Sequence, residues 1–286
     1  MATAVLATCQ FQVQKNSKDN LRCVLGQIER AVAKGAHIVH FSEACLSGYL
    51  GVEVPNHEST DWNRIMVAME EIMAAAKRHR VCVVVGCNHR LTGKHKPHNS
   101  LYVIDSRGKL VTRYDKMFCT GSNSAEGDLL HYTPGADLVT FRVRGITCGL
   151  LICHDFRYPE LFRAYKQQGV ELMLVSFHNA GMTKANYDKY LATVPATLQA
   201  AAASNYFTVS ATNGTRKYAW PSFVVSAEGL VVSKASAHRS AILINKIDTK
   251  KKLYDASAAW RGRCMRGIFH SGTLVRDDRS RKRNML

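Results

Sequence analysis

Cys153 is the residue whose surroundings suit nucleophilic chemistry best. It follows the apolar run Ile146 to Ile152, which has the pattern of a short strand buried on both faces. Pro159 and Glu160 come soon after it, and both residue types are favoured in the first turn of a helix. A thiol between a strand and a helix start has free backbone N–H groups nearby and a helix dipole that favours the thiolate. From its neighbouring sequence alone, Cys153 is equally well interpreted as a catalytic nucleophile and as a small buried apolar residue.

Two further polar side chains stand at the ends of predicted strands. Glu43 follows an apolar strand expected over residues 37–41, where a carboxylate is either a general base with a raised pKa or a surface acid in a turn. Lys116 follows a hairpin whose strands are expected over 101–105 and 110–114. A lysine at a hairpin exit is usually solvated, so neither residue is informative alone. The informative feature is an acid, an amine and a thiol at three strand ends.

The ordered set Glu43, Lys116 and Cys153 resembles the Glu-Lys-Cys triad of the nitrilase superfamily of carbon–nitrogen hydrolases. Four segments carry the resemblance: FSEACLSGY around Glu43, RYDKMF around Lys116, HYTPG at 131–135 and CHDFRYPE from Cys153. The resemblance covers nearly the whole chain, to about Asn245. It implies an α/β fold of the four-layer α-β-β-α sandwich type, with the triad carried on strand ends.

The resemblance also implies hydrolysis of an amide through a thioester acyl-enzyme, with release of ammonia and without a cofactor. Glu43 would act as the general base, and Lys116 with the backbone N–H of His154 would hold the oxyanion. The pattern C-x-D-x-R-x-P-E after the cysteine is similar to the amidase and N-carbamoyl-amide hydrolase branches and unlike the C-W-E of nitrilases. A small linear amide is therefore the favoured substrate, an N-carbamoyl amino acid the second and a nitrile the third.

Five residues are predicted to contact the substrate: Tyr49, Asp128, His154, His178 and Asn179. His178 and Asn179 follow a strand expected over 170–176, on the same rim as Cys153. Members of the superfamily commonly carry a second glutamate four residues before the aromatic of an F/Y-x-P-G motif. Here that position holds Asp128, and Glu126 lies two residues earlier. The sequence leaves open which acid, if either, enters the pocket.

The net charge of +17, from 39 Lys and Arg against 22 Asp and Glu, is high for a metabolic enzyme. Such a field attracts anionic ligands and, without specificity, nucleic acid. The basic residues are dispersed apart from Lys250–Lys252 and Arg279–Arg283, and no aromatic-interleaved basic motif accompanies them. We expect mostly solvated surface, with selection of an acidic substrate as the lesser alternative. A non-enzymatic alternative is a fold that has lost catalysis and binds a partner through its basic surface, against which the intact triad argues.

The chain is expected to form one domain over residues 1–286, because no linker or low-complexity run divides it. The opening MATAVLATCQFQV lacks the positive n-region of a signal peptide, and no apolar stretch is long enough to span a membrane. Nine cysteines without CxxC pairs indicate reduced thiols and a cytoplasmic protein. His89, His95 and His98 fit no familiar zinc pattern, so no metal site is predicted.

Two amphipathic helices are expected near the N-terminus. The first covers residues 17–34 with Ser17 as its cap, and the second covers residues 62–79 with Thr60 or Asp61 as its cap. Both have apolar positions at helical spacing, so both should cover a sheet.

The second half of the chain repeats features of the first. The segments YVIDSRGKLVTRY and FVVSAEGLVVSKA look alike, which predicts a pseudo-twofold pair of sheets packed face to face. A helix is expected over 196–203 with Pro195 at its start, followed by a strand over 206–212. Residues 250–286 carry aromatics without a period, so this tail is predicted to pack on a neighbouring subunit of a homodimer or larger homo-oligomer.

Overall fold

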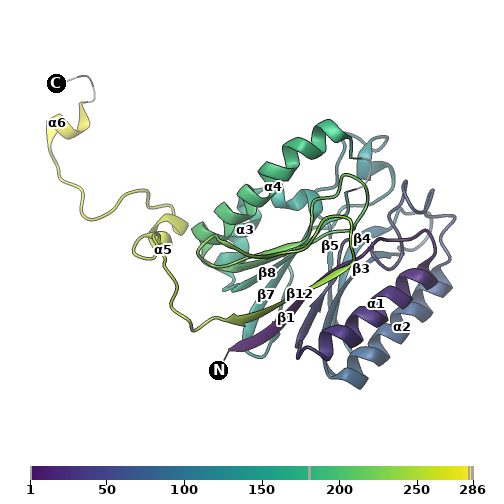
Figure 1. Ribbon diagram of the computed structural model, residues 1–286. Coiled ribbons are helices and arrows are strands. Elements are labelled where there is room, and N and C mark those ends of the chain that lie inside the picture. Colours follow the sequence, from purple (N-terminus) through teal and green to yellow (C-terminus); the bar gives the residue numbers. More distant parts are fainter. Residues whose placement is uncertain (1, 180–181, 283, 285–286) are drawn as a thin grey trace.

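The computed structural model describes residues 2–179, 182–282 and 284, and its body is a sandwich of four layers. Two six-stranded sheets lie face to face. Helices α1 (Ser17–Val32) and α2 (Trp62–His79) cover the first sheet, and α3 (Pro159–Gln167) and α4 (Lys184–Asn205) cover the second (Figure 1). The α-β-β-α sandwich expected from the sequence is confirmed.

The first sheet has the strand order β12-β1-β2-β3-β4-β5. Its three central strands, β1, β2 and β3, run parallel, and β12, β4 and β5 pair antiparallel with their neighbours. The bounds are β1 (Thr3–Gln10), β2 (Ile38–His40), β3 (Cys82–His89), β4 (His98–Ile104), β5 (Leu110–Asp115) and β12 (Ala241–Asp248).

The second sheet has the order β11-β10-β9-β8-β7-β6 and repeats this pattern of directions. Strands β7, β8 and β9 run parallel, and β10 and β11 form a hairpin like that of β4 and β5. The bounds are β6 (Thr140–Val143), β7 (Ile146–Ile152), β8 (Leu172–Ser176), β9 (Thr208–Thr212), β10 (Phe223–Val225) and β11 (Val231–Lys234). The two sheets therefore share one topology, as their similar hairpins predicted.

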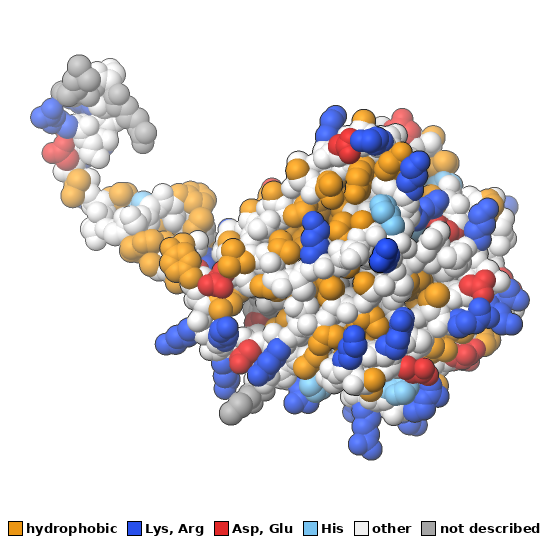
Figure 2. Space-filling model, in the orientation of Figure 1, with side chains coloured by type: hydrophobic (Ala, Val, Ile, Leu, Met, Phe, Trp, Pro, Cys, Tyr) orange, Lys and Arg blue, Asp and Glu red, His pale blue; other side chains and the backbone are white. Residues whose placement is uncertain are grey.

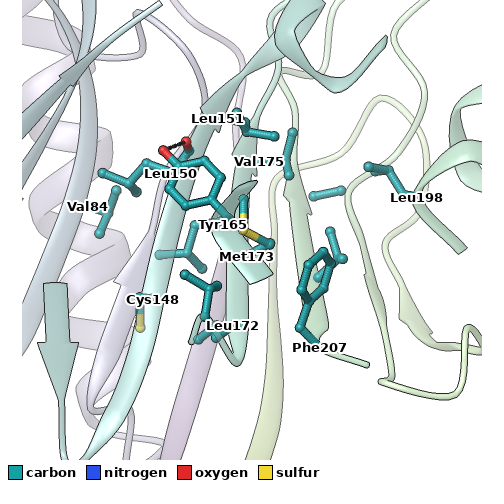
Figure 3. Packing of buried hydrophobic residues seen from close by; sticks show 14 of the residues in the cluster. Val84, Cys148, Leu150, Leu151, Tyr165, Leu172, Met173, Val175, Leu198 and Phe207 are labelled. Atoms are coloured by element: carbon teal, nitrogen blue, oxygen red, sulfur yellow. Dashed lines mark hydrogen bonds between the residues drawn. The ribbon is translucent and has the colours of Figure 1, made fainter. Parts of the chain in front are cut away.

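Successive side chains of a strand point to opposite faces of the sheet, so the core has one part between the sheets and another between each sheet and its helices. On β1, Leu6 packs between the sheets, whereas its neighbour Ala7 packs against α1 and α2. In the second sheet the core extends to α3, where the hydroxyl of Tyr165 donates to the carbonyl oxygen of Leu150 at 2.7 Å (Figure 3). The central strands are buried on both faces, which explains their nearly continuous apolar runs.

A chain of neutral hydrogen bonds, the inter-sheet chain, crosses the middle of the sandwich at His40. Ser176 on β8 donates to the carbonyl oxygen of Phe41 at 2.8 Å, so its hydroxyl oxygen must accept from Nε2–H of His40 at 2.9 Å. Nδ1 of His40 then accepts from Ser210 on β9 at 2.9 Å, and Ser210 accepts from Thr8 at 2.7 Å. Burial lowers the pKa of His40 to about 3. The residue therefore stays neutral and holds the sheets in register.

The two N-terminal helices form where the sequence placed them. The cap of α1 is Asn16, whose side-chain oxygen accepts from the N–H of Lys18 at 2.9 Å, so the assignment of the cap to Ser17 is wrong. Ser17 is already helical. The cap of α2 is Asp61, which accepts from the N–H of Arg64 at 2.9 Å, as one of the two alternatives predicted.

The prediction that a helix starts at Pro195 is wrong, because α4 begins eleven residues earlier and contains Pro195 in its interior. The side chain of Thr183 caps it by accepting from the N–H of Asn186 at 3.3 Å. Every buried residue of α4 lies in its last twelve positions, so its first half shows no apolar period. The next strand starts at Thr208 rather than at residue 206, because Tyr206 ends the helix in a left-handed conformation.

After β12 the chain leaves the sandwich as an extended tail (Figure 1). It contains α5 (Arg261–Met265) and α6 (Asp278–Arg281), and apolar side chains gather on its surface (Figure 2). Its exposed large apolar residues are Tyr254, Trp260, Ile268, Phe269, Leu274 and Val275. The body contacts its first part, where Arg261 donates to the carbonyl oxygen of Ser204 at 2.8 Å. Packing of this tail on a neighbouring subunit stays a prediction. No helix in the described residues is long and apolar enough to cross a membrane.

Candidate active site

Cys153 lies directly after β7, at the first position of a short 3-10 helix, Cys153–Arg157. Its φ of 43° is in the left-handed region, which a cysteine adopts only where its surroundings enforce it. The carboxylate of Asp155 fixes this turn by accepting from the N–H of Ile152 at 3.0 Å, from the hydroxyl of Tyr114 at 2.7 Å and from the N–H of Phe118 at 2.7 Å. Burial raises the pKa of Asp155 to about 6. This carboxylate therefore ties the cysteine turn to the end of β5.

The end of β5 delivers Lys116 to two carboxylates, and we call Glu43, Lys116 and Asp128 the charged cluster. The ammonium group donates to Glu43 Oε1 at 2.9 Å and to Asp128 Oδ2 at 2.7 Å. All three side chains are at most 6% exposed. Asn99 on β4 also donates to Glu43 Oε1, at 2.8 Å. Within the described chain, Glu43 Oε2 has no hydrogen-bond partner, so one oxygen of this base is free to accept a proton.

Burial and neighbouring charge set the protonation of this cluster. Burial raises the pKa of Glu43, against the lowering effect of Lys116. For Lys116, burial acts to lower the pKa, but Glu43 and Asp128 outweigh it, so the ammonium form is retained. Burial and then Glu43 raise the pKa of Cys153, whereas Lys116 and a backbone hydrogen bond from His178 act in the other direction. The cysteine is thus a thiol at rest and needs a base to become a nucleophile.

Of the two acids that the sequence left open, Asp128 faces the pocket. It accepts from Lys116, from the hydroxyl of Tyr49 and from the N–H of Thr120 at 3.0 Å. Burial opposes ionisation, but Lys116 and the hydrogen bonds outweigh it and hold the pKa of Asp128 below its usual value. Glu126 is exposed and accepts from Ser122 at 2.6 Å instead. The shorter aspartate reaches the ammonium group because the helical turn Gly127–Leu130 carries it inward.

A cavity of about 400 Å³ opens beside the cysteine, and it brings together all five residues predicted to contact the substrate. Cys153, Lys116 and Asp128 line it together with Tyr49, His154, His178 and Asn179. Glu43 is fully buried next to Lys116. The cavity is also lined by aromatic, apolar and basic side chains, namely those of Leu50, Val52, His131, Phe156, Arg157, Met182, Tyr190 and Trp220.

One wall of the cavity is held by Glu53, which the sequence did not single out. Its Oε2 accepts from the N–H of Tyr49 and lies 3.1 Å from His178 Nε2, while Oε1 pairs with Arg216. Burial opposes the charge, but His178 and Arg216 outweigh it, so the pKa of Glu53 is lowered. The imidazole ring stacks on the ring of Tyr49, with centroids 5.3 Å apart. The amide of Asn179 bonds to Asn213 and to the carbonyl of Tyr218, so protein contacts orient it.

Asn99, Asp155 and Glu53 support the site, and the sequence contains a signal for two of them. Asn99 is one of the polar residues just before the strand expected over 101–105, and Asp155 stands inside the CHDFRYPE segment. Glu53 lies in a loop, where no motif or periodicity of the sequence marks it. The histidines first considered for zinc lie elsewhere: the rings of His89 and His98 stack at 6.3 Å. In the described residues, no group of three or more His, Cys, Asp or Glu is arranged to hold a metal.

The chain is similar to known carbon–nitrogen hydrolases and amidases. The sequence profile of the family described as carbon-nitrogen hydrolase matches residues 5–251. An omega-amidase of Mus musculus is 28% identical over 273 residues, which are 88% of this chain and 91% of that protein. A deaminated glutathione amidase of Yersinia enterocolitica is 28% identical over 183 residues, which are 61% of this chain and 63% of that protein.

Solved structures with the same fold are amidases from Nesterenkonia. The crystal structure of one has a TM-score of 0.74 and 20% identity, and the match covers 92% of this chain and 95% of the other. In a mutant of that amidase, with the same TM-score and identity and coverages of 92% and 96%, the acetamide moiety of fluoroacetamide is covalently added at the active site cysteine. At this identity the likeness establishes the sandwich fold alone.

Proposed function

This chain belongs to the carbon–nitrogen hydrolase family, and from that premise we propose that it hydrolyses small linear amides through a thioester formed on Cys153. The observation that carries the proposal is the convergence of Cys153 and the charged cluster at one cavity. An amidase-type hydrolase of the nitrilase superfamily needs a thiol, a base and an electrophilic cation around one carbonyl carbon. We assign these three roles to Cys153, Glu43 and Lys116.

In the acylation step, Glu43 removes the proton of the Cys153 thiol through its free Oε2, and the thiolate attacks the amide carbon. The ammonium group of Lys116 and the backbone N–H of His154 stabilise the negative oxygen that forms. Glu43 then returns the proton to the leaving nitrogen, and ammonia departs. Asp128 keeps a counter-charge on Lys116 while Glu43 is protonated, so the cation stays in place throughout the step.

In the deacylation step, water takes the place of ammonia. Glu43 removes a proton from this water, which attacks the thioester carbon, and the same oxyanion contacts apply. The carboxylic acid product leaves, and Cys153 regains its proton from Glu43. One carboxylate performs both proton transfers, and the raised pKa of Glu43 suits it to act as base and acid in turn.

Arg157 favours a second, narrower candidate, namely an amide that carries a carboxylate. Its guanidinium lies over the rings of Phe156 and Tyr190, 5.1 Å and 4.7 Å from their centroids, and it lines the cavity. In the described residues it has no carboxylate within ion-pair distance. An unpaired guanidinium beside a reacting amide suits an anionic substrate group. Arg157→Met should then raise KM for an acidic amide about tenfold and leave KM for a neutral amide of similar size within twofold.

The test of the main proposal is ammonia release from a panel of amides, N-carbamoyl amino acids and nitriles. Linear amides should give the highest kcat/KM, and mass spectrometry after rapid quenching should find the acyl group on the peptide that contains Cys153. Cys153→Ala should abolish turnover. Release of carbon dioxide with ammonia would favour the carbamoyl alternative, whereas full turnover by Cys153→Ala would exclude the thioester mechanism.

Two further features belong to the same proposal. The apolar residues of the extended tail are suited to a second copy of this chain, which supports a homo-oligomer. All nine cysteines are free, and most are buried, which supports a reducing cytoplasmic environment. Sedimentation of the full chain and of a chain ending after residue 249 would test the homo-oligomer. We expect the truncated chain to lose the oligomer.

A further inference from the structure

A second cavity lies at the opposite end of the sandwich from the active site, and we call it the basal cavity. The triad residues follow the carboxyl ends of β2, β5 and β7, whereas the basal cavity lies at the amino ends of β2 and β3. It is also lined by the turn of the β4–β5 hairpin and by the β6–β7 turn, so both sheets contribute to it. Its volume is about 340 Å³, and its polar lining is His37, Arg80, Asp105, Ser106, Arg107, Arg142 and Arg144.

Among the residues that the structure describes, three of its four arginines have no carboxylate within ion-pair distance. The fourth, Arg107, pairs with Asp105, with Nη2 and Oδ2 2.9 Å apart. Arg142 and Arg144 donate to backbone carbonyl oxygens, at 3.3 Å and 3.0 Å, which leaves their positive charge uncompensated. The guanidinium of Arg80 has no hydrogen bond or ion pair in the described residues. Since Asp105 is the one acid in the lining, the cavity has an excess of positive charge.

His37 adds a donor rather than an acceptor. Its Nδ1 accepts from the backbone N–H of Val5 at 2.9 Å, so the proton of the neutral ring must be on Nε2. Burial and then the charge of Arg144 lower the pKa of His37, which keeps the ring in this neutral form. The free polar groups of the lining are thus predominantly N–H donors.

Two of these arginines also occupy left-handed backbone positions. Arg80 ends α2 with φ of 52°, and Arg144 occupies the β6–β7 turn with φ of 51°. Glycine or asparagine adopts this left-handed conformation more readily than arginine does, so both positions tolerate replacement by asparagine.

We propose that the basal cavity binds a small phosphorylated organic molecule of the size of a nucleoside monophosphate. Guanidinium groups bind phosphate oxygens in bidentate fashion, and three of them suit a group with two negative charges. Val103, Phe141 and Val143 provide an apolar wall for the organic part. The volume is within the usual range for small-molecule sites, roughly 300–1,000 Å³.

Isothermal titration of the full chain with adenosine 5′-monophosphate and with inorganic pyrophosphate, in about 150 mM salt, tests the proposal. We expect saturable binding of one molecule per chain. Arg80→Asn/Arg144→Asn should weaken it at least tenfold, and asparagine suits both left-handed positions. The control Arg22→Gln/Arg78→Gln removes two charges from α1 and α2 outside the cavity and should change affinity less than twofold.

Arg142→Gln gives a second variant that leaves both turns untouched, and it should weaken binding at least fivefold. Cys153→Ala should bind both probes as the parent chain does, and Arg80→Asn/Arg144→Asn should keep its amide turnover. No saturable binding of either probe at 1 mM, or an equal loss of affinity in the control, would overturn the proposal. Competition between these probes and an amide substrate would also overturn it, because the ligand would then occupy the active site.

Discussion

The inter-sheet chain and the charged cluster are both buried, and their members His40 and Glu43 are three residues apart. In the inter-sheet chain every group is neutral, and each donor has one acceptor, from Thr8 to the carbonyl oxygen of Phe41. In the charged cluster two carboxylates share one ammonium group, and Glu43 Oε2 has no partner in the described residues. The two regions are equally buried, but one holds only satisfied neutral groups and the other holds charges and a free carboxylate oxygen.

The neutral chain and the charged cluster are expected to differ in what they contribute to the stability of the fold. A net contribution of about 1 kcal/mol is typical of each neutral hydrogen bond in such a chain. Ions that lose their water are costly, and their attraction often only offsets that loss. We therefore expect the inter-sheet chain to affect stability and the charged cluster to affect turnover. Four measurements test this contrast.

The largest effect is expected for Glu43→Gln, which keeps the shape of the side chain and removes its basicity. Its kcat/KM for an amide should fall by about 10³-fold, the order of a lost general base. Thermal unfolding should show an unchanged or higher midpoint, because a buried charge has been removed. A fall in stability without a fall in turnover would reverse the roles assigned to the two regions.

Lys116→Met should lower the free energy of unfolding by about 3 kcal/mol, because it leaves Glu43 and Asp128 buried without a counter-ion. The triple variant Glu43→Gln/Lys116→Met/Asp128→Asn should regain most of that loss, since no charge is then left unpaired. It should remain inactive. Denaturant unfolding of the three proteins measures this, and a triple variant as unstable as the single one would contradict the account.

Acid should weaken the fold through His40. Burial holds its folded pKa at about 3, whereas in the unfolded chain it is about 6.5. Between these values the unfolded state binds more protons, so stability falls as pH falls. From pH 7.5 to pH 5 this contribution amounts to about 2 kcal/mol. In His40→Leu the free energy of unfolding should depend less on pH by this amount. The kcat/KM of this variant should stay within about threefold of the parent.

The smallest effect is expected for Tyr49→Phe, which removes the hydroxyl that donates to Asp128. Loss of a hydrogen bond to a carboxylate should lower the free energy of unfolding by about 1.5 kcal/mol. Turnover should fall less than tenfold, because Lys116 still pairs with Asp128. Calorimetry and steady-state kinetics of the same preparation would show this, and a loss as large as that of Glu43→Gln would make Tyr49 a member of the proton-transfer machinery.

The strand ends were the part of the site that the sequence predicted best. Glu43 and Cys153 each follow an apolar run and Lys116 follows a predicted hairpin, and these patterns favour strands. The opening of α2 at Asp61 followed from local chemistry in the same way. Features that depend on a short stretch of sequence, such as strand ends and the cap of α2, were therefore predictable. The roles of the three residues came from the resemblance to the nitrilase superfamily and not from these patterns.

Contacts between distant segments could not be predicted in this way. The choice of Asp128 over Glu126 depends on how a 3-10 turn is oriented, and the partnership of Glu53 with His178 joins residues 125 positions apart. The start of α4 was missed because its first half faces solvent and carries no apolar stripe. In each case tertiary packing, rather than local propensity, determines the outcome.

The pairing of β1 with β12 has a consequence for biosynthesis. Thr3 lies opposite Asp248, so β1 lacks its edge partner after its own synthesis until the other strands of the sandwich have been translated. At typical rates of synthesis that interval is roughly 12–50 s. During it, an apolar strand with unpaired N–H and C=O groups is exposed to other nascent chains. We therefore expect chaperones to bind this protein early in translation and to release it only once residues 241–248 have emerged.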